Sequence, residues 1–273
     1  MDWSNFGLIT LCSMAVLAVL QLGTWVWSRR AGRWAVVDVV WGAGFAAVGL
    51  TSALVGSLAD GSVDLRTLIL TALVCAWGLR LSWHIFRRSR GTGEDPRYED
   101  LTEGLGPLPA ALKVFGLQGA LQWVISLPLQ ASAAAGPTQG PWVLMLIAGV
   151  LVFAVGLAFE AIGDAQLAAF KADPEHEGAV MDRGLWAWTR HPNYFGDACV
   201  WWGMFFVVAS AATWGVGWTV LSPVLMTHFL RNVSGAKLLE RSMQDRPAFR
   251  EYMRRTAYFF PRPPKRAGEA TAS

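Results

Sequence analysis

A series of long apolar segments limits what this chain can fold into. Crossing a bilayer as a helix takes roughly 20 mostly apolar residues, and seven stretches approach or exceed that length. The chain is 53% hydrophobic and only 16% charged, whereas soluble domains carry about a quarter charged residues. We therefore predict an all-α integral membrane protein with about seven transmembrane helices. The expected spans are 6–27, 34–58, 65–86, 112–135, a segment from 142 that extends to 170, 196–212 and 214–230.

The positions of the basic residues predict the orientation of these spans. Of 23 lysines and arginines, only Arg66 falls in a connection on the same side as the N-terminus. Cytoplasmic connections are enriched in Lys and Arg, so we expect the N-terminus outside and the C-terminus in the cytoplasm. The basic balance then reflects topology and anionic headgroups, not nucleic acid. We expect one membrane bundle over 1–260, and a disordered tail over 261–273.

The most polar stretch of the chain, 182–197, lies between two apolar segments. Pro192 restricts His191 to an extended conformation and suits the first turn of the following helix. A helix N-terminus beside Arg190 and His191 forms an anion site, for which phosphate is the natural ligand. Binding of lipid headgroups is the alternative. The polar side chains of the stretch that we consider for a cofactor site are Arg183, Arg190, His191, Asn193, Tyr194 and Asp197.

The helix before that stretch carries three charged residues on one face. Glu160 and Asp164 are four residues apart and Lys171 follows seven later, so a continuous helix places them together. They could hold the hydroxyl and amide groups of a ligand. A salt-bridged helix end is the alternative.

Further polar residues lie within or beside the earlier spans. An acid inside a span, such as Asp38, is a functional candidate, although pairing with Arg33 or Arg80 would be a structural explanation. His84 follows in the third span, and a polar loop that contains Arg97 and Tyr98 comes after it. The fourth span has polar residues every fourth position, which either join helices or line a cavity; they are Gln118, Gln122, Ser126 and Gln130.

Two other patterns suggest packing instead of chemistry. Residues 42–47 fit the dinucleotide pattern GxGxxA, but no strand precedes them, so we interpret these glycines as a close helix contact. The three cysteines, Cys12, Cys75 and Cys199, lie in apolar segments without metal-binding spacing. We predict no metal site.

The segments 160–171, 182–197 and 231–261 resemble the steroid 5α-reductase family, especially its bacterial branch of membrane proteins. The resemblance covers most of the chain. It implies a seven-helix bundle that holds NADPH in a cavity open to the cytoplasm, here of the bacterial inner membrane. It also implies hydride transfer to the β carbon of an enone in a steroid-like or other lipid substrate, with no obligate protein partner.

Carried over by position, the resemblance assigns NADPH contacts to Glu160, Asp164, Lys171, Asn193 and Asp197. Arg190 and His191 are assigned to the pyrophosphate, with Arg183 and Tyr194 beside them. Asp38 resembles the acid that helps to polarise the substrate carbonyl, and His84 matches a histidine that precedes the family's proton-donating tyrosine. The next residue here is Ile85, so His84, Tyr98 or Tyr194 would take that role, or the substrate is not a 3-oxosteroid.

Two other functions remain open at this stage. Isoprenylcysteine and phospholipid methyltransferases, which use S-adenosylmethionine, share the Arg-His-Pro-x-Tyr core and a Glu-containing tail; here Glu240, Tyr252 and Pro261 follow that pattern. The acidic pair at 160 and 164 favours the reductase. The remaining alternative is a lipid-binding or transport protein without catalysis.

Overall fold

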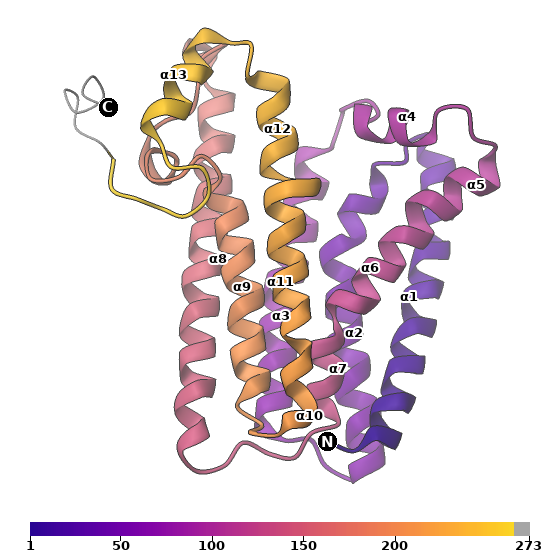
Figure 1. Cartoon of the computed structure of the whole chain (residues 1–273). Coiled ribbons are helices and arrows are strands. Elements are labelled where there is room, and N and C mark those ends of the chain that lie inside the picture. Colours follow the sequence, from indigo (N-terminus) through magenta and orange to yellow (C-terminus); the bar gives the residue numbers. More distant parts are fainter. Residues whose placement is uncertain (265–273) are drawn as a thin grey trace. The chain divides into compact units, whose positions relative to one another are not determined.

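The computed structural model describes residues 1–264, and in that part of the chain the regular structure is helical, without strands (Figure 1). The chain forms two compact units. Unit 1 comprises 1–148 and 204–222, and the described part of unit 2 comprises 149–203 and 223–264. A single bundle over 1–260 stays a prediction. The tail expected at 261–273 lies mostly outside the described residues, and 261–264 have no regular structure.

Three long helices form the first part of unit 1. They are α1 (Trp3–Ala31), α2 (Val36–Asp60) and α3 (Leu65–Arg88). The side chains of Asp2 and Asp64 accept hydrogen bonds from the first free amides of α1 and α3, which satisfies donors that a helix start leaves unpaired. Gly32 and Gly61 end α1 and α2 in the left-handed region, with φ of 66° and 70°. The three first spans are thus confirmed as helices.

Helices α2 and α3 pack with their backbones in contact. A Cβ added to Gly42 would lie 2.2 Å from the carbonyl oxygen of Gly78, so neither position accepts a larger residue. At Gly44 the added atom would lie 2.1 Å from Nε2 of Gln122. The GxGxxA segment is therefore a helix contact, as its position within a span predicted.

The next part of unit 1 consists of short helical segments. Tyr98, expected in a loop, lies in a short helix that starts at Pro96. The helix expected at 112–135 is wrong in its bounds, because the helix starts at Pro107 and breaks at Ser126, just before Pro128. The segments are α4 (Pro96–Thr102), α5 (Pro107–Ala111), the π-helical η1 (Leu112–Gly116), α6 (Leu117–Ile125), α7 (Leu127–Ala133) and the 3-10 helix η2 (Gly140–Trp142).

The polar residues of this region join helices. The side chain of Gln122 donates to the carbonyl of Trp41 at 2.8 Å and accepts from Gln21 at 2.7 Å. Gln130 donates to Ser126 at 2.9 Å. The sequence left two interpretations for the polar residues at every fourth position, a contact between helices or the lining of a cavity. At Gln122, which is fully buried, the structure supports the contact between helices.

Unit 1 also contains a turn near the N-terminus, where α10 (Trp214–Gly217) and the 3-10 helix η5 (Trp218–Val220) begin the last helical stretch. The amide of Asp2 donates to the carbonyl of Ala134 at 2.8 Å. Ser210 and Thr138 share a hydrogen bond of 2.7 Å, and the ring of Trp218 contacts that of Phe6. The turn after residue 209 and the connection before residue 140 therefore lie close to the N-terminus in space.

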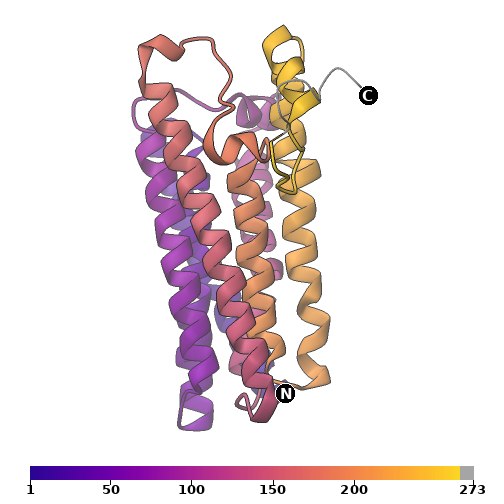
Figure 2. The ribbon, with the colours of Figure 1, turned by 90° about the vertical axis from the view of Figure 1, so that its left-hand side faces the viewer.

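Unit 2 is organised around two helices that run side by side in both ribbon views (Figures 1 and 2). These are α8 (Val143–Ala172) and α9 (Pro192–Ala209). A Cβ on Gly196 would lie 2.5 Å from the amide of Glu160, and one on Gly156 would lie 2.6 Å from the carbonyl of Gly196. Gly203 meets the backbone of Phe153 in the same way. Glycines thus allow α8 and α9 to touch along their length.

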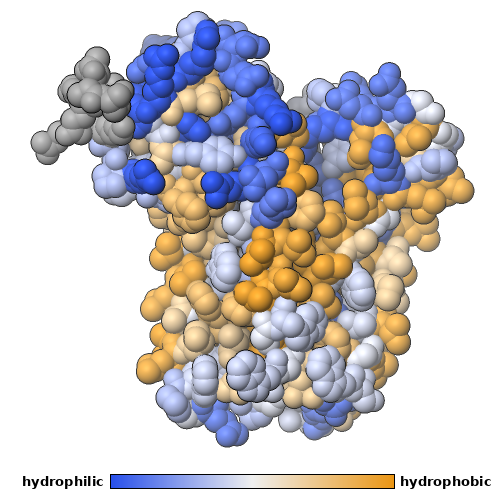
Figure 3. Space-filling view, viewed as in Figure 1, coloured by the Kyte–Doolittle hydropathy of each residue, from blue (hydrophilic) through white to orange (hydrophobic). Residues whose placement is uncertain are grey.

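The other elements of unit 2 are short. The connection from α8 to α9 contains η3 (Pro174–His176) and η4 (Gly184–Ala187), and the final part contains α11 (Leu221–His228), the π-helical η6 (Phe229–Val233), α12 (Ala236–Met243) and α13 (Pro247–Arg255). In the space-filling view, hydrophilic side chains gather over α12 and α13, and also around α4 of unit 1 (Figure 3).

Five helices within the described residues are long and apolar enough to cross a membrane. The expected spans at 196–212 and 214–230 are helical but do not reach this standard: α9 begins with polar residues, and 214–233 is divided among four short segments. The five are Trp3–Ala31, Val36–Asp60, Leu65–Arg88, Pro107–Ile125 and Gly140–Ala172.

Candidate functional site

Among the described residues, two groups of interacting polar side chains contain predicted site residues, one group in each unit. In unit 1 the group, called here the Asp38 cluster, consists of Asp38, Asp95, Arg97, Tyr98 and Gln118. In unit 2 the group, called the Glu240 cluster, consists of Arg190, His191, Glu240 and Tyr258. A third, smaller contact joins Asp164 and Asn193 at the crossing of α8 and α9.

The carboxylate of Asp38 is bound at both oxygens. The hydroxyl of Tyr98 donates to Oδ1 at 2.5 Å, and Arg97 donates to Oδ2 at 3.0 Å. The amide of Gln118 approaches the Tyr98 oxygen at 3.4 Å. Arg97 is also paired with Asp95 at 2.8 Å. Of the two structural pairings considered from sequence, with Arg33 or with Arg80, the first is not found, because Arg33 binds loop carbonyls such as that of Ser89.

The buried position of Tyr98 controls its acidity. Its ring packs in an apolar cluster with Val37, Val114 and Phe115, and only 6% of the residue is exposed. Burial first, and then the charge of Asp38, raise the pKa of Tyr98 well above its usual value. The phenol therefore stays protonated at neutral pH and remains a hydrogen-bond donor.

Local sequence explains how α4 presents these side chains. Asp95 caps α4 by accepting the amide of Arg97 at 2.9 Å, and Pro96 occupies the first helical position. The hydrogen bond from Arg97 is the main cause that lowers the pKa of Asp95. Just before the cap, Glu94 accepts the backbone amides of Trp34 and of Ala35, so it binds the start of α2. These contacts fix α4 beside the end of α2 that carries Asp38.

His84 lies half-buried on α3. The amide of Ala43 donates to Ser82 at 2.9 Å, and Gly42 contacts Gly78. Asp38 precedes this contact on α2, and His84 follows it on α3. Because the two helices run antiparallel, both residues lie on the same side of the contact, near the start of α2 and the end of α3.

In unit 2, the predicted acids of α8 lie at its contact with α9. Glu160 and Asp164 are 3% and 7% exposed. Asn193 donates its side-chain amide to Asp164 at 3.1 Å, and Asp197, one turn later on α9, is also buried. The structure thus brings Asp164 and Asn193 together, and the spacing of Glu160 and Asp164 places both on the buried face of α8.

Arg190 and His191 meet at one carboxylate. Oε1 of Glu240 is hydrogen-bonded to Nε2 of His191 at 2.9 Å and lies 2.7 Å from Nε of Arg190. Arg190 also donates to the carbonyl of Met253 at 2.7 Å, and its guanidinium lies over the ring of Tyr258. The ring of His191 stacks on Tyr194. Arg190 and His191, the basic side chains that were expected to bind phosphate at the start of α9, are therefore paired with the carboxylate of Glu240.

The chain after α11 forms further contacts with the 182–192 segment. Tyr252 donates to the carbonyl of Trp186 at 2.6 Å, and Thr189 donates to that of Phe259 at 2.9 Å. Arg255 is paired with Asp182. The chain at α13 and after it thus packs on this segment.

The two remaining predicted cofactor residues, Lys171 and Arg183, are exposed. For neither does the structure give an ion pair or side-chain hydrogen bond within residues 1–264. Both cations are therefore available for an anionic ligand.

Sequence reasoning missed two contacts. Glu240 was noticed as part of the tail but not as the partner of Arg190, since 50 residues separate them. Arg97 was considered as a loop residue that could meet a 2′-phosphate and not as a partner of Asp38, although its position directly before Tyr98 was a usable signal. The described residues contain no group of acidic, His and Cys side chains arranged for a metal.

Within residues 1–264, these features define a helical protein with five candidate membrane-spanning helices, a buried tyrosine bound to an acid, and a polar contact where α8 meets α9. Residues 24–256 match the family described as "Protein of unknown function (DUF1295)", and the chain belongs to that family. No curated protein and no solved structure matches it.

Proposed function

We propose that the chain is a membrane-embedded, NADPH-dependent reductase that saturates a C=C bond conjugated to a carbonyl in a steroid-like or other lipid substrate. The observation that carries this proposal is the 2.5 Å hydrogen bond between Tyr98 and Asp38. A phenol that stays protonated, buried beside a carboxyl, suits the stabilisation of an enolate oxygen. It also answers the objection raised by Ile85, because Tyr98 supplies a donor that an isoleucine cannot.

The proposed reaction is balanced by one cofactor and one proton. NADPH, when bound, would supply a hydride for the β carbon of the enone, and a proton added at the α carbon would complete the saturated ketone, with NADP⁺ as the other product. Tyr98 has one hydroxyl proton, which it donates to Asp38 before substrate binds. To hold the carbonyl oxygen, Tyr98 would turn this proton from Asp38 Oδ1 to the substrate. Arg97, which donates to Asp38 Oδ2, would then keep the carboxylate paired, and Gln118, which donates to the Tyr98 oxygen, would keep the phenol in position.

The side chains of unit 2 fit a phosphorylated nucleotide. The amide of Asn193 and the carboxyls of Glu160 and Asp164 provide acceptors and donors for ribose hydroxyls and a carboxamide. The exposed Lys171 and Arg183 provide charge for phosphate groups, including a 2′-phosphate. Arg190 and His191, with their shared partner Glu240, then hold the start of α9 in place, and contact phosphate only when Glu240 releases them.

Relationship to the steroid 5α-reductases is part of the same proposal. It adds two further crossings, α9 and 214–233, to the five candidate spans, and places the active site at the cytoplasmic side of the bacterial inner membrane. The positions of Asp38, Asp164, Asn193 and Asp197 in their motifs support it.

Binding and turnover measured on the same variants test this function. In purified full-length protein, NADPH should bind saturably, followed by nicotinamide fluorescence, and enone-containing steroids or lipids should be reduced. Tyr98→Phe and Asp38→Asn should each lower turnover about 10²-fold, with NADPH affinity nearly unchanged. Asn193→Leu should weaken NADPH binding instead. Loss of NADPH binding in the first two variants would remove Tyr98 and Asp38 from the proposed role.

One observation favours a methyltransferase as a second candidate. Unit 2 brings Glu240 of the tail onto the Arg-His-Pro-x-Tyr core, the two features that this chain shares with enzymes using S-adenosylmethionine. The α-carboxylate of that cofactor could replace Glu240 at Arg190. Equilibrium dialysis with both cofactors distinguishes the candidates: saturable binding of S-adenosylmethionine alone would reject the reductase.

A further inference from the structure

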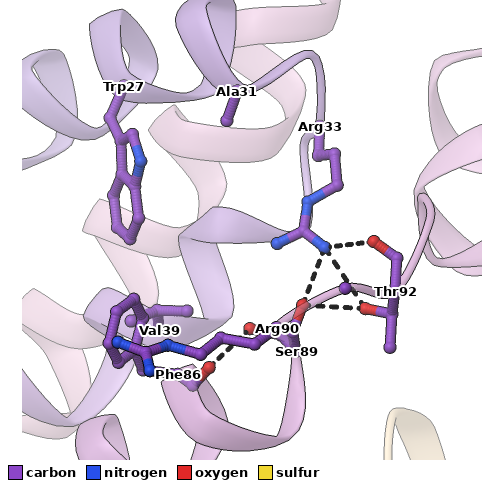
Figure 4. Close-up of a pocket in the computed structure, with 9 residues that line it drawn as sticks. Trp27, Ala31, Arg33, Val39, Phe86, Ser89, Arg90 and Thr92 are labelled. Atoms are coloured by element: carbon purple, nitrogen blue, oxygen red, sulfur yellow. Dashed lines mark hydrogen bonds between the residues drawn. The ribbon is translucent and has the colours of Figure 1, made fainter.

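A basic hollow lies at one end of the three long helices of unit 1, separate from the Asp38 cluster. It has a volume of about 310 Å³ and is shown in Figure 4. None of its lining residues is acidic. They are Trp27, Ala31, Arg33, Val39, Phe86, Ser89, Arg90, Gly91 and Thr92.

Two arginines supply the charge of the hollow. Arg33 donates through Nη1 to the carbonyls of Ser89 at 2.9 Å and Thr92 at 2.5 Å. All of its hydrogen bonds within residues 1–264 use that nitrogen, and Figure 4 shows Nη2 pointing toward the side where Trp27 and Val39 lie. Arg90 extends over the ring of Phe86, 4.5 Å from its centroid. Both guanidinium groups are thus held in place while keeping donors available.

The hollow lies at the level expected for lipid headgroups. α1 ends at Ala31, α2 begins at Val36 and α3 ends at Arg88, and each of these helices is a candidate span. Tryptophan and arginine are the residues that favour this boundary.

An apolar strip continues from the hollow along α3. Phe86 contacts Trp83, with ring centroids 5.9 Å apart, and Trp83 and Leu79 are each 58% exposed. The spacing of 79, 83 and 86 places all three on one helix face. A ligand with a phosphate and an attached acyl chain matches this sequence of charge and then apolar surface.

We propose that this hollow binds the headgroup of an anionic phospholipid, with the phosphate between Arg33 and Arg90 and an acyl chain along Phe86, Trp83 and Leu79. Basic pockets between membrane helices are known to hold such headgroups. The inference does not depend on the reductase, because none of its residues belongs to the Asp38 or Glu240 clusters.

Thermal unfolding of the full-length protein in mixed micelles tests the site. Phosphatidylglycerol should stabilise the protein at lower concentration than phosphatidylcholine. Arg90→Gln should weaken the phosphatidylglycerol effect about fivefold to tenfold. Val39→Phe, which fills the hollow without a charge change, should weaken it as well. Arg87→Gln is the matched control: it removes the same charge from an exposed residue three positions earlier, in the last turn of α3, and should have little effect.

Three results would overturn the proposal. They are equal stabilisation by the two lipids, an equal loss in Arg87→Gln and Arg90→Gln, or full stabilisation by inorganic phosphate alone. The last result would identify an anion site that does not require a lipid. If Arg90→Gln lowers the unfolding temperature even in phosphatidylcholine, Val39→Phe, which keeps both arginines, still shows whether filling the hollow weakens the phosphatidylglycerol effect.

Discussion

Tyr98 is surrounded by groups that oppose its ionisation. Its hydroxyl lies 2.5 Å from a carboxylate oxygen of Asp38, and its ring is buried among apolar side chains. Loss of the phenolic proton would place two negative charges next to each other at low exposure. The same contact that keeps Tyr98 a donor therefore makes the fold sensitive to high pH.

We expect this sensitivity to be visible in the alkaline limb of stability. Because the pKa of Tyr98 is higher in the folded state than in the unfolded state, its contribution is fully present below the unfolded pKa of about 10 and is lost as pH rises toward the folded value. The unfolding temperature of the wild type should thus fall above about pH 10 more steeply than that of Tyr98→Phe. Parallel alkaline limbs in the two proteins would show that Tyr98 is not protected as the structure indicates.

The second residue-scale prediction concerns Glu240. It is the shared partner of Arg190 and His191, and the side chains of Arg190 and Glu240 are 9% and 11% exposed. Breaking a buried pair by removing one partner typically costs about 3–5 kcal/mol. Glu240→Gln should therefore lower the unfolding temperature clearly.

The chain provides a matched control for that variant. Glu251 pairs with Arg254 on α13, and the two side chains are 56% and 78% exposed. Glu251→Gln removes the same charge from the same tail but from a solvated pair, which contributes little. If the two variants unfold alike, Glu240 does not hold the tail on the 182–192 segment.

At the scale of elements, glycine decides how closely helices approach. In unit 2, Gly156 and Gly196 face each other across α8 and α9, and a Cβ on Gly196 would meet the amide of Glu160 at 2.5 Å. The contact is between backbones, so no rotamer change relieves it. The position of Glu160 and Asp164 relative to Asn193 therefore depends on residues without side chains.

Gly196→Ala is expected to destabilise the protein by about 1–3 kcal/mol or more, as overpacking does, and to weaken nucleotide binding by separating Asp164 from Asn193. Gly23→Ala is the control, because a Cβ at Gly23 of α1 meets nothing within 4 Å. There the change should be neutral or stabilising. Unfolding temperatures and nucleotide titrations of both variants measure the difference; an unchanged Gly196→Ala would mean that α8 and α9 are not in contact.

How far the sequence predicts this molecule differs between elements and contacts. The first three helices were predictable because long apolar runs end at residues such as Gly32 and Gly61. The break at Ser126 was not, since the apolar pattern continues through Pro128. The bond of Tyr98 to Asp38 joins residues 60 positions apart. Sequence placed both among the site candidates but could not pair them, because pairing depends on how α4 turns after its cap.

The whole molecule raises the question of how often the chain crosses the membrane. In the part of the chain that the structure describes, five helices are long and apolar enough to cross a membrane, whereas the apolar runs of the sequence predict seven crossings. Both numbers are odd, so the positions of the termini do not distinguish them. The decisive segment is the turn after α9, which contains Thr213.

We propose seven crossings, and contacts within unit 1 support this number. The turn lies with the N-terminus, since Ser210 binds Thr138 and a Cβ on Gly215 would lie 2.8 Å from the side chain of Met1. In a cysteine-free background, a cysteine introduced as Thr213→Cys should react with a membrane-impermeant maleimide from the same side as Ser4→Cys. Ser242→Cys of α12 should react only from the opposite side. Labelling of Thr213→Cys together with Ser242→Cys would leave five crossings and place α9 outside the bilayer, where Asn193 and Asp197 would need no membrane-buried ligand to explain them.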